Sequence, residues 1–156
     1  MLEIDIPGVG NLHLKHLICD YNGTLAVDGR LIDGVARRLE LLGRQMALHV
    51  VTGDPLGTAE VELAALDVNL LVLSDDDQAI FKEDYLRTLG MNGVVAIGNG
   101  SNDRHMLQKS ALGIAVIGPE GASSIALGAA DLVALDILSA LDMLTHPQRI
   151  ITSLRC

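Results

Sequence analysis

The chain has 156 residues, 49% of them hydrophobic and 2% aromatic, and its formal net charge is -9 at pH 7. We expect one compact domain, because this length supplies a sizeable core and leaves no room for a second domain. The acidic balance argues against nucleic acids and anionic membranes as partners, since both bind clustered lysine and arginine. The scarcity of aromatic rings also argues against stacking on nucleic acid bases.

Cysteine usage and hydropathy indicate the compartment. Cys19 ends an apolar run and Cys156 is the last residue, so a disulfide framework is not expected. The chain begins without a basic segment followed by an apolar run, and no stretch approaches the roughly 18 apolar residues of a membrane helix. We therefore expect a soluble, cytoplasmic protein with no membrane partner.

The first segments alternate apolar and polar residues. Leu2–Ile6 and residues 12–16 have this period of two and flank a Pro-Gly breaker, which predicts an antiparallel hairpin within residues 2–19, with His13 and His16 on its surface. The apolar run 17–19 then predicts the end of a buried parallel strand. Asp20 would follow that strand, at its carboxyl end.

Residues 25–32 carry an Asp-Gly turn between apolar pairs, which predicts a second hairpin, placed as a flap over the region after Asp20. A helix is expected from an Asp33 cap to Gly43, followed by a strand at 46–51. Thr52 and Gly53 end that strand just before a helix at 57–66, a position that suits phosphate. An ordinary helix cap by Thr52 or Asp54 is the simpler alternative.

The second half continues the alternation. Strands are expected at 68–73, 94–97, 112–117 and 131–135, and the last helix at 138–144 before a tail whose structure is left open. Asp75, Asp76 and Asp77 are assigned to capping the helix that contains Lys82. In that helix Lys82 lies beside the apolar face, where a surface lysine is the simpler alternative.

This order of elements predicts an α/β fold. Alternating strands and helices give right-handed crossovers and a doubly wound, three-layer α/β/α Rossmann-like parallel sheet, with one crevice at the carboxyl ends of the strands. Asp20, Thr52 and the loop 99–103 all fall at such ends. Capping explains each of these places alone, but it does not explain why they recur together.

Four short motifs resemble those of the haloacid dehalogenase superfamily. Asp20-Tyr21-Asn22-Gly23-Thr24 resembles its first motif, D-x-D-G-T, and the D-K-T-G-T variant of P-type ATPases. The segments 51–54 and 98–103 resemble the second and fourth motifs, and Lys82 is similar to the third. The resemblance covers residues from about 14 to 144 and implies a capless domain like the ATPase phosphorylation domain, without its membrane helices or inserted nucleotide-binding domain.

The resemblance implies Mg²⁺-dependent phosphoryl transfer through an aspartyl-phosphate. Asp20 would be the nucleophile, while Thr52 and Lys82 would hold the phosphoryl oxygens. A carboxylate needs nearby positive charge to approach a phosphate dianion, and Mg²⁺ and a lysine supply it. The other residues carried over from the motifs are the metal ligands Asp20, Asn22, Asn99 and Asp103, and the ligand-binding residues Gly23, Thr24, Gly53 and Asn102.

Two positions depart from the family pattern. Asn22 replaces the aspartate that protonates the leaving group and activates water, and an amide does neither, so we expect slow turnover or a long-lived phosphoenzyme. Asn99 replaces an aspartate of the fourth motif and removes a negative charge from the metal site. Asp103 would then carry more of the cation, through a water.

Three functions follow as hypotheses. The favoured one is a Mg²⁺-dependent phosphohydrolase that acts on a small phosphorylated molecule. The alternative is a non-catalytic module that binds phosphate or a phosphorylated ligand for regulation, and a phosphoryl-accepting receiver is a weaker third. Because no cap domain is recognisable, a homo-oligomer whose neighbouring subunit closes the crevice is also expected. Replacing Lys82 by alanine should weaken phosphate binding and leave the melting temperature nearly unchanged.

Overall fold

The computed structural model describes residues 1–74 and 76–156, so the predicted cap residue Asp75 lies outside the described part. Its centre is a six-stranded sheet in the order β10-β9-β8-β3-β6-β7, with every neighbouring pair parallel. The prediction of a doubly wound parallel sheet is confirmed. The strands are β3 His16–Cys19, β6 Ala47–Thr52, β7 Asn69–Val72, β8 Val94–Gly98, β9 Leu112–Val116 and β10 Leu132–Ala134.

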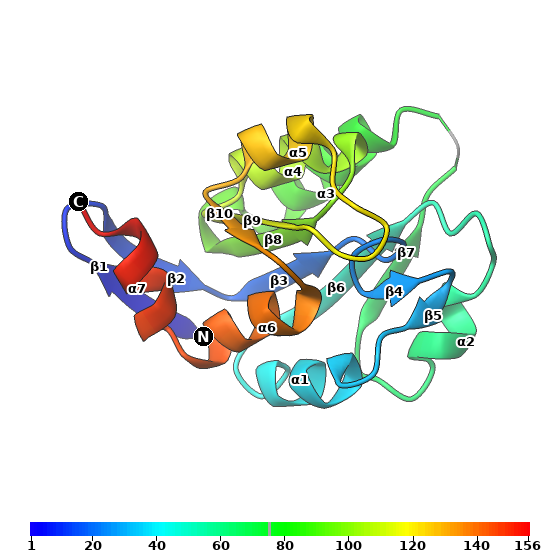
Figure 1. Ribbon diagram of the computed structural model, residues 1–156, viewed down its shortest axis with the longest axis horizontal. Helices are drawn as coiled ribbons and strands as arrows, with labels where there is room; N and C mark the ends of the chain where they lie inside the picture. The colour runs from blue at the N-terminus through cyan, green and yellow to red at the C-terminus, as the bar shows by residue number, and fades with distance from the viewer. Residues whose placement is uncertain (75) are drawn as a thin grey trace.

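Helices cover both faces of this sheet and make the three predicted layers (Figure 1). The apolar faces of α1, α2 and α6 join one core cluster, and those of α3, α4 and α5 join a second cluster on the opposite side. The helices are α1 Val35–Leu42, α2 Ala59–Leu63, α3 Gln78–Leu89, α4 Arg104–Lys109, α5 Ser124–Ala129, α6 Ile137–Thr145 and α7 Gln148–Leu154, with short 3₁₀ turns η1 Met91–Gly93 and η2 Ser101–Asp103.

The strand order reverses direction at β3. From β3 the chain first crosses to β6 on one side and later returns to β8 on the other, and both pair with β3. Ligands of open α/β sheets bind outside the carboxyl ends of the strands at such a switch point. Asp20 directly follows β3 and therefore stands at that point.

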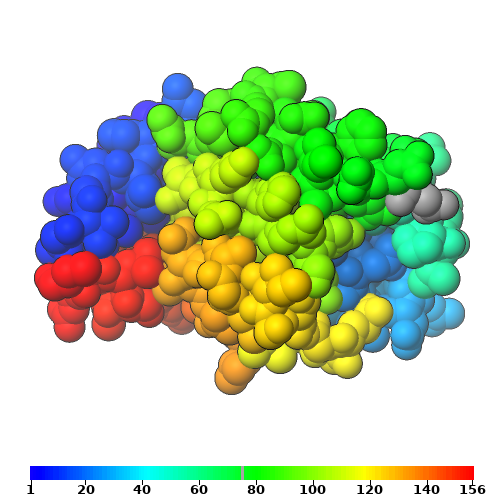
Figure 2. Space-filling view, turned by 90° about the horizontal axis from the view of Figure 1, so that it is seen from above, coloured from blue at the N-terminus to red at the C-terminus, as the bar shows by residue number. Residues whose placement is uncertain are grey.

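The predicted N-terminal hairpin is present. β1 Leu2–Ile6 pairs antiparallel with β2 Gly10–Leu14. The tail left open by the sequence forms α7, and Ile150 of this helix is buried in the same cluster as the apolar side of β1. Figure 2 shows this helix and the hairpin side by side at one end of the molecule, away from the loops after β6.

The second hairpin pairs β4 Ala26–Val27 with β5 Arg30–Leu31. Asp28 and Gly29 both have positive φ, as the predicted Asp-Gly turn requires. The carbonyl of Gly29 accepts hydrogen bonds from the hydroxyls of Tyr21, at 2.9 Å, and Thr58, at 2.6 Å. These bonds tie the tip toward α2, and residues 25–32 are not among the described residues that line the crevice, so a flap over the site stays a prediction.

Two predicted side-chain caps are absent. The N-cap of α1 is Gly34 in the left-handed region rather than Asp33, and the N-cap Asp77 of α3 makes no capping bond with its side chain. Both residues have positive φ at the turn into the helix, a geometry that apolar and charge patterns do not encode. The cap predicted before α2 is real and is made by Asp54, whose carboxylate accepts hydrogen bonds from the amides of Thr58 and Ala59.

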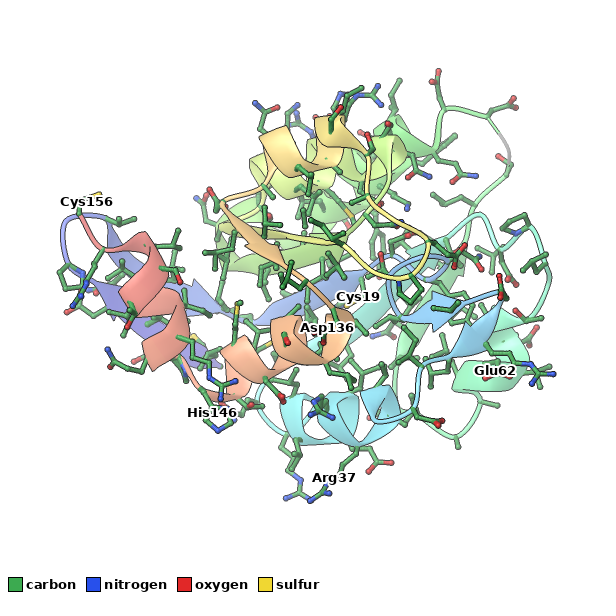
Figure 3. The ribbon with its side chains drawn as sticks, in the orientation of Figure 1. Cys19, Arg37, Glu62, Asp136, His146 and Cys156 are labelled. Carbon is green, nitrogen blue, oxygen red and sulfur yellow. The ribbon has the colours of Figure 1, made fainter. Side chains whose placement is uncertain are left out.

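The two cysteines are far apart, as expected for a chain without a disulfide framework. Cys19 is buried in the central strand and Cys156 is exposed at the end of the chain, far from it, and both thiols are free (Figure 3). Within residues 1–74 and 76–156, every helix is too short or too polar to span a membrane.

Candidate active site

A crevice of about 260 Å³ lies at the carboxyl end of β3. Its walls come from the segments that follow three neighbouring strands, β3, β6 and β8, and from the first turn of α3. This convergence follows from the parallel sheet, since carboxyl ends of parallel strands meet at one edge. The lining residues are Asp20, Asn22, Thr52, Gly53, Pro55, Gln78, Asn99, Gly100 and Asn102.

Lys82 lies beneath the crevice between two carboxylates. Its Nζ donates to Oδ1 of Asp20 and to Oδ1 of Asp103, at 2.7 Å in each case. The side chains of Lys82 and Asp103 are both 0% exposed. A buried lysine is tolerated only when it is paired, and here two carboxylates share its charge.

Both carboxylate oxygens of Asp103 accept hydrogen bonds. Its Oδ2 accepts the backbone N–H groups of Asn99, at 3.0 Å, and Gly100, at 2.9 Å, while its Oδ1 holds Lys82. The carboxylate therefore ties the loop after β8 to α3. Its position in the fourth motif made it a candidate metal ligand, but in the structure it holds the lysine and the loop.

Asp20 presents its second oxygen toward Thr24. The Thr24 hydroxyl lies 3.4 Å from Oδ2 of Asp20 and 3.1 Å from Oδ1 of Asn99, so these two oxygens flank one hydroxyl. Gly23 forms the turn between them with φ of +79°, and a Cβ there would collide with the Asn99 amide. The Asn99 amide nitrogen donates instead to the carbonyl of Gly121, at 3.1 Å.

The charges around Asp20 shift its ionisation. Burial and the nearby Asp103 carboxylate raise the pKa of Asp20 to about 6, and the Lys82 ammonium opposes this rise. Burial works against the charge on Lys82, but the two carboxylates outweigh it and hold the Lys82 pKa above its usual value. The site therefore combines an ammonium whose charged form is favoured with one carboxylate that faces the crevice.

Thr52 and Gly53 form the wall at the end of β6. The Thr52 hydroxyl oxygen accepts the backbone N–H of Asp54 at 3.0 Å, so its hydrogen is free to donate into the crevice. Gly53 lies against the side chain of Gln78, where an added Cβ would meet the amide. Gln78 in turn accepts a hydrogen bond from Asn102 at 2.9 Å, which joins the start of α3 to the fourth motif.

Asn22 differs from its neighbours because its side-chain amide nitrogen is buried and has no hydrogen-bond partner. Buried polar groups are usually satisfied, and one that lines a crevice is a candidate to meet a ligand. Its side chain offers an N–H donor and a carbonyl acceptor but no titratable proton.

The oxygens at the crevice fit a divalent cation of the magnesium type. The structure brings an oxygen of Asp20 and the amide oxygen of Asn99 to one hydroxyl, and Mg²⁺ prefers few hard oxygen ligands with several waters. The described residues include no group of three or more acidic, histidine or cysteine side chains arranged to hold a metal. Such an ion would therefore depend on amide and backbone oxygens beside the single carboxylate of Asp20.

The structure brings the residues of all four motifs together. Asp20, Asn22, Thr52, Gly53, Asn99 and Asn102 line the crevice, Thr24 and Gly23 lie beside it, and Lys82 and Asp103 lie beneath it. The expectation that replacing Lys82 leaves the melting temperature unchanged does not fit this burial, because two buried carboxylates would lose their partner.

Sequence reasoning missed Gln78. This residue begins α3 and stands four positions before Lys82, so both side chains point to the crevice side of the helix. The spacing of four residues from Lys82 is the sequence signal that could have identified Gln78 as a site residue. Burial of Ala79, Lys82, Glu83 and Leu86 together, with polar and apolar residues mixed on one face, weakened the helical pattern.

No family model matches the chain. An uncharacterized protein of Methanocaldococcus jannaschii is 47% identical over 57 residues, which is 36% of this chain and 61% of that relative. The chain thus matches about three fifths of the length of that relative.

Solved structures are similar over most of the chain. The 3-deoxy-D-manno-octulosonate 8-phosphate phosphatase of Moraxella catarrhalis, crystallised with magnesium, phosphate and its sugar, has a TM-score of 0.71 and 16% identity over 90% of this chain and 91% of its own. The cobalt-bound form of the corresponding phosphatase of Haemophilus influenzae has a TM-score of 0.71 and 17% identity, covering 88% and 90%.

A third similar structure is a protein of Legionella pneumophila assigned to the haloacid dehalogenase superfamily, subfamily III A. Its TM-score is 0.71 and its identity 19%, covering 90% of this chain and 87% of its own. The chain therefore has the haloacid dehalogenase fold, as the motifs implied.

Proposed function

We propose that this protein is a phosphohydrolase of the haloacid dehalogenase superfamily that acts on a small phosphorylated molecule through an aspartyl-phosphate at Asp20. The fold and the similar phosphatases support this class of activity. The observation that carries the proposal is the position of Asp20. Its carboxylate lies at the switch point of the sheet, faces the crevice and contacts a buried lysine at 2.7 Å.

The proposed roles follow from the contacts. An oxygen of Asp20 attacks the phosphorus, and Lys82 behind it offsets the repulsion between the carboxylate and the phosphate dianion. The free hydroxyl hydrogen of Thr52 and the amides after β3 and β8 donate to the phosphoryl oxygens. Asp103 positions Lys82 and the loop after β8, and it does not contact the substrate in this proposal.

Mg²⁺ is the proposed cofactor, held by Asp20, the backbone carbonyl of Asn22 and the amide oxygen of Asn99. When bound it would neutralise charge on the phosphoryl group. With one carboxylate facing it, we expect weak binding. Asp103 remains a candidate ligand through a water, and its direct bonds to Lys82 and two amides make that role secondary.

The activity is tested with acetyl phosphate and p-nitrophenyl phosphate in the presence of Mg²⁺. The unmodified protein should release phosphate, and mixing it with acetyl phosphate should add one phosphoryl group to the peptide that contains Asp20, detected by mass spectrometry. Asp20→Asn should abolish both signals. Asp84→Asn, on the exposed side of α3, is the matched control and should change neither. Equal phosphate release by Asp20→Asn would disprove the proposal.

The second candidate function is a non-catalytic module that binds phosphate or a phosphorylated ligand. Asn22 favours it, because the amide cannot act as the acid and base of turnover. In that case orthovanadate or phosphate would stabilise the protein, while the peptide that contains Asp20 would stay unmodified after exposure to acetyl phosphate.

A homo-oligomer and a cytoplasmic location remain predictions. The crevice is small, and the chain between β3 and β6 contains the hairpin, α1 and their connections. Sedimentation or light scattering on the purified protein measures whether a second copy is present to close it.

A further inference from the structure

The crevice contains no described acid that could protonate a departing group. Of the nine residues that line it, within residues 1–74 and 76–156, Asp20 alone carries an ionisable side chain. Asp20 is the proposed nucleophile and cannot serve as the acid in the same step. Asn22, which stands closest to it in sequence on the crevice wall, has an amide that donates a hydrogen bond but transfers no proton.

The neighbouring ionisable groups are held by other partners. Both oxygens of Asp103 are engaged, by Lys82 and by the amides of the loop after β8. The carboxylate of Asp54 accepts the amides at the start of α2, with Oδ1 at 3.1 Å from the nitrogen of Thr58. Lys82 donates to two carboxylates, which stabilise its charged form and oppose release of its proton.

We infer that the substrate is an acyl phosphate or a phosphoanhydride rather than an alkyl phosphate ester, an inference that rests on the proposed function. A carboxylate or phosphate leaves as a stable anion, since a carboxylic acid has a pKa of about 4. An alkoxide is nearly as basic as hydroxide, far more basic than a carboxylate, so it leaves with a proton.

The first step then needs no proton. A lone pair of Asp20 forms a new O–P bond, the bond from phosphorus to the leaving oxygen breaks, and its electron pair departs with the carboxylate or phosphate. The amide nitrogen of Asn22 is buried without a partner, and in this proposal it donates a hydrogen bond to an oxygen of the bound substrate. A donor that stabilises an anion without giving up a proton suits such leaving groups.

The second step is the slow one. A water oxygen attacks phosphorus, the bond to Asp20 breaks, and its electron pair returns to the carboxylate. The proton of the water passes to an oxygen of the departing phosphate, because the described crevice residues offer no other base. General base catalysis contributes about 10²–10⁴ in rate, and its absence makes phosphorylated Asp20 accumulate.

The volume of the crevice agrees with a small substrate. About 260 Å³ lies just below the roughly 300–1,000 Å³ of pockets that enclose drug-sized ligands. It has room for a phosphoryl group and a short acyl or phosphate group. A larger leaving group would extend outside the lining residues.

The test is a series of substrates that differ in the basicity of the leaving group. Initial rates are measured with acetyl phosphate, inorganic pyrophosphate, p-nitrophenyl phosphate, phenyl phosphate and glycerol 3-phosphate, all with Mg²⁺. The kcat/KM of the wild-type protein should fall by at least about 10² from acetyl phosphate to glycerol 3-phosphate, given the size of a missing general acid. Comparing kcat/KM for acetyl phosphate with that for pyrophosphate shows whether the protein prefers acyl phosphates or phosphoanhydrides. Equal kcat/KM for glycerol 3-phosphate and acetyl phosphate would overturn the inference and leave the phosphohydrolase proposal standing.

Asn22→Asp supplies the missing acid and is nearly isosteric. It should raise kcat/KM for glycerol 3-phosphate by about 10²–10⁴ and change that for acetyl phosphate only a few fold. Asp75→Asn is compared in parallel because Asp75 lies outside the described residues. A steeper dependence on leaving-group basicity in that variant would identify Asp75 as the acid and overturn the inference.

The unmodified protein also gives a readout without turnover. After mixing with acetyl phosphate, the intact mass of the wild-type protein should show that Asp20 is phosphorylated. The phosphorylated fraction should be smaller in Asn22→Asp. Failure of every substrate together with an unmodified Asp20 peptide would remove the proposed function and the inference with it.

Discussion

The ammonium of Lys82 lies 2.7 Å from a carboxylate oxygen of Asp20, although 62 positions separate the two residues in the chain. The same ammonium holds Asp103 at the same distance. One buried cation therefore joins the first, third and fourth motifs. Because each carboxylate is buried, this bridge contributes to folding as well as to the proposed chemistry.

The first prediction concerns the bridge itself. Lys82→Met should lower the free energy of unfolding by about 3–5 kcal/mol at pH 8, because it leaves two buried carboxylates without a cation. Urea denaturation in the presence of a metal chelator measures the loss. The loss should be smaller at pH 5, below the raised pKa of Asp20, where a protonated Asp20 carboxyl needs no cation.

Lys109→Met is the matched control. Lys109 is more than a third exposed and pairs with Glu83, which Arg87 also contacts, so its removal should cost less than about 1 kcal/mol. An equal loss of stability in both variants would contradict the role given to Lys82.

The second prediction concerns Asp103. Its two oxygens both accept hydrogen bonds, and an asparagine can accept on one side only, so Asp103→Asn should place an N–H against either Lys82 or the loop amides. We expect a loss of about 1–3 kcal/mol, measured by urea denaturation. Asp84→Asn on the exposed side of α3 should be neutral. An unchanged stability in Asp103→Asn would show that the observed contacts contribute nothing.

The third prediction concerns pH and a network at the opposite end of the sheet. Nδ1 of His16 lies 3.1 Å from Nε2 of His49, whose Nδ1 lies 2.8 Å from the Tyr85 hydroxyl. Burial, and then the neighbouring His16, lower the pKa of His49. Burial and then Lys15 lower the pKa of His16.

The direction in which stability changes with pH follows from the lowered pKa values of His16 and His49. In the unfolded chain these histidines take up protons below about pH 6.5, whereas the folded protein keeps them neutral to lower pH. Their contribution to stability is therefore complete above pH 6.5 and is lost as the pH falls toward the folded pKa values. Asp20, with its raised pKa, contributes with the opposite sign.

The comparison with a variant isolates the histidine contribution. His49→Gln keeps a hydrogen-bonding side chain and removes the titration of residue 49. The unfolding free energy at pH 7.5 minus that at pH 5.5 should therefore be smaller in this variant than in the wild-type protein. Urea denaturation at both pH values gives the two differences. An identical pH dependence in the two proteins would mean that the His49 pKa is not lowered by folding.

The fourth prediction concerns the metal. Mg²⁺ should raise the melting temperature of the unmodified protein, since a ligand that binds only the folded state stabilises it by mass action. Asn99→Asp adds a charged ligand and should tighten the Mg²⁺ dissociation constant by about tenfold, while Asn99→Ala should weaken it. Calorimetric titration measures the constants, with Asp84→Asn as control. Equal constants in all four proteins would exclude Asn99 as a ligand.

The sequence by itself determined the sheet and the places where chemistry gathers. Apolar runs of strand length alternate with helical patterns, and this local periodicity fixes which strands are buried and where each one ends. Asp20, Thr52 and the loop after β8 were therefore placed correctly at one edge. Periodicity is a property of neighbouring residues, so it can be read without knowing the rest of the fold.

The tertiary structure decided which side chains meet. Burial of Lys82 against Asp20 and Asp103 and the entry of Gln78 into the crevice depend on segments far apart in the chain. An acid at a strand end looks the same in sequence whether it caps a helix, holds a lysine or faces a ligand. Its hydrogen-bond partners make that choice, and those partners are set only when the sheet brings β3, β6, β8 and α3 together.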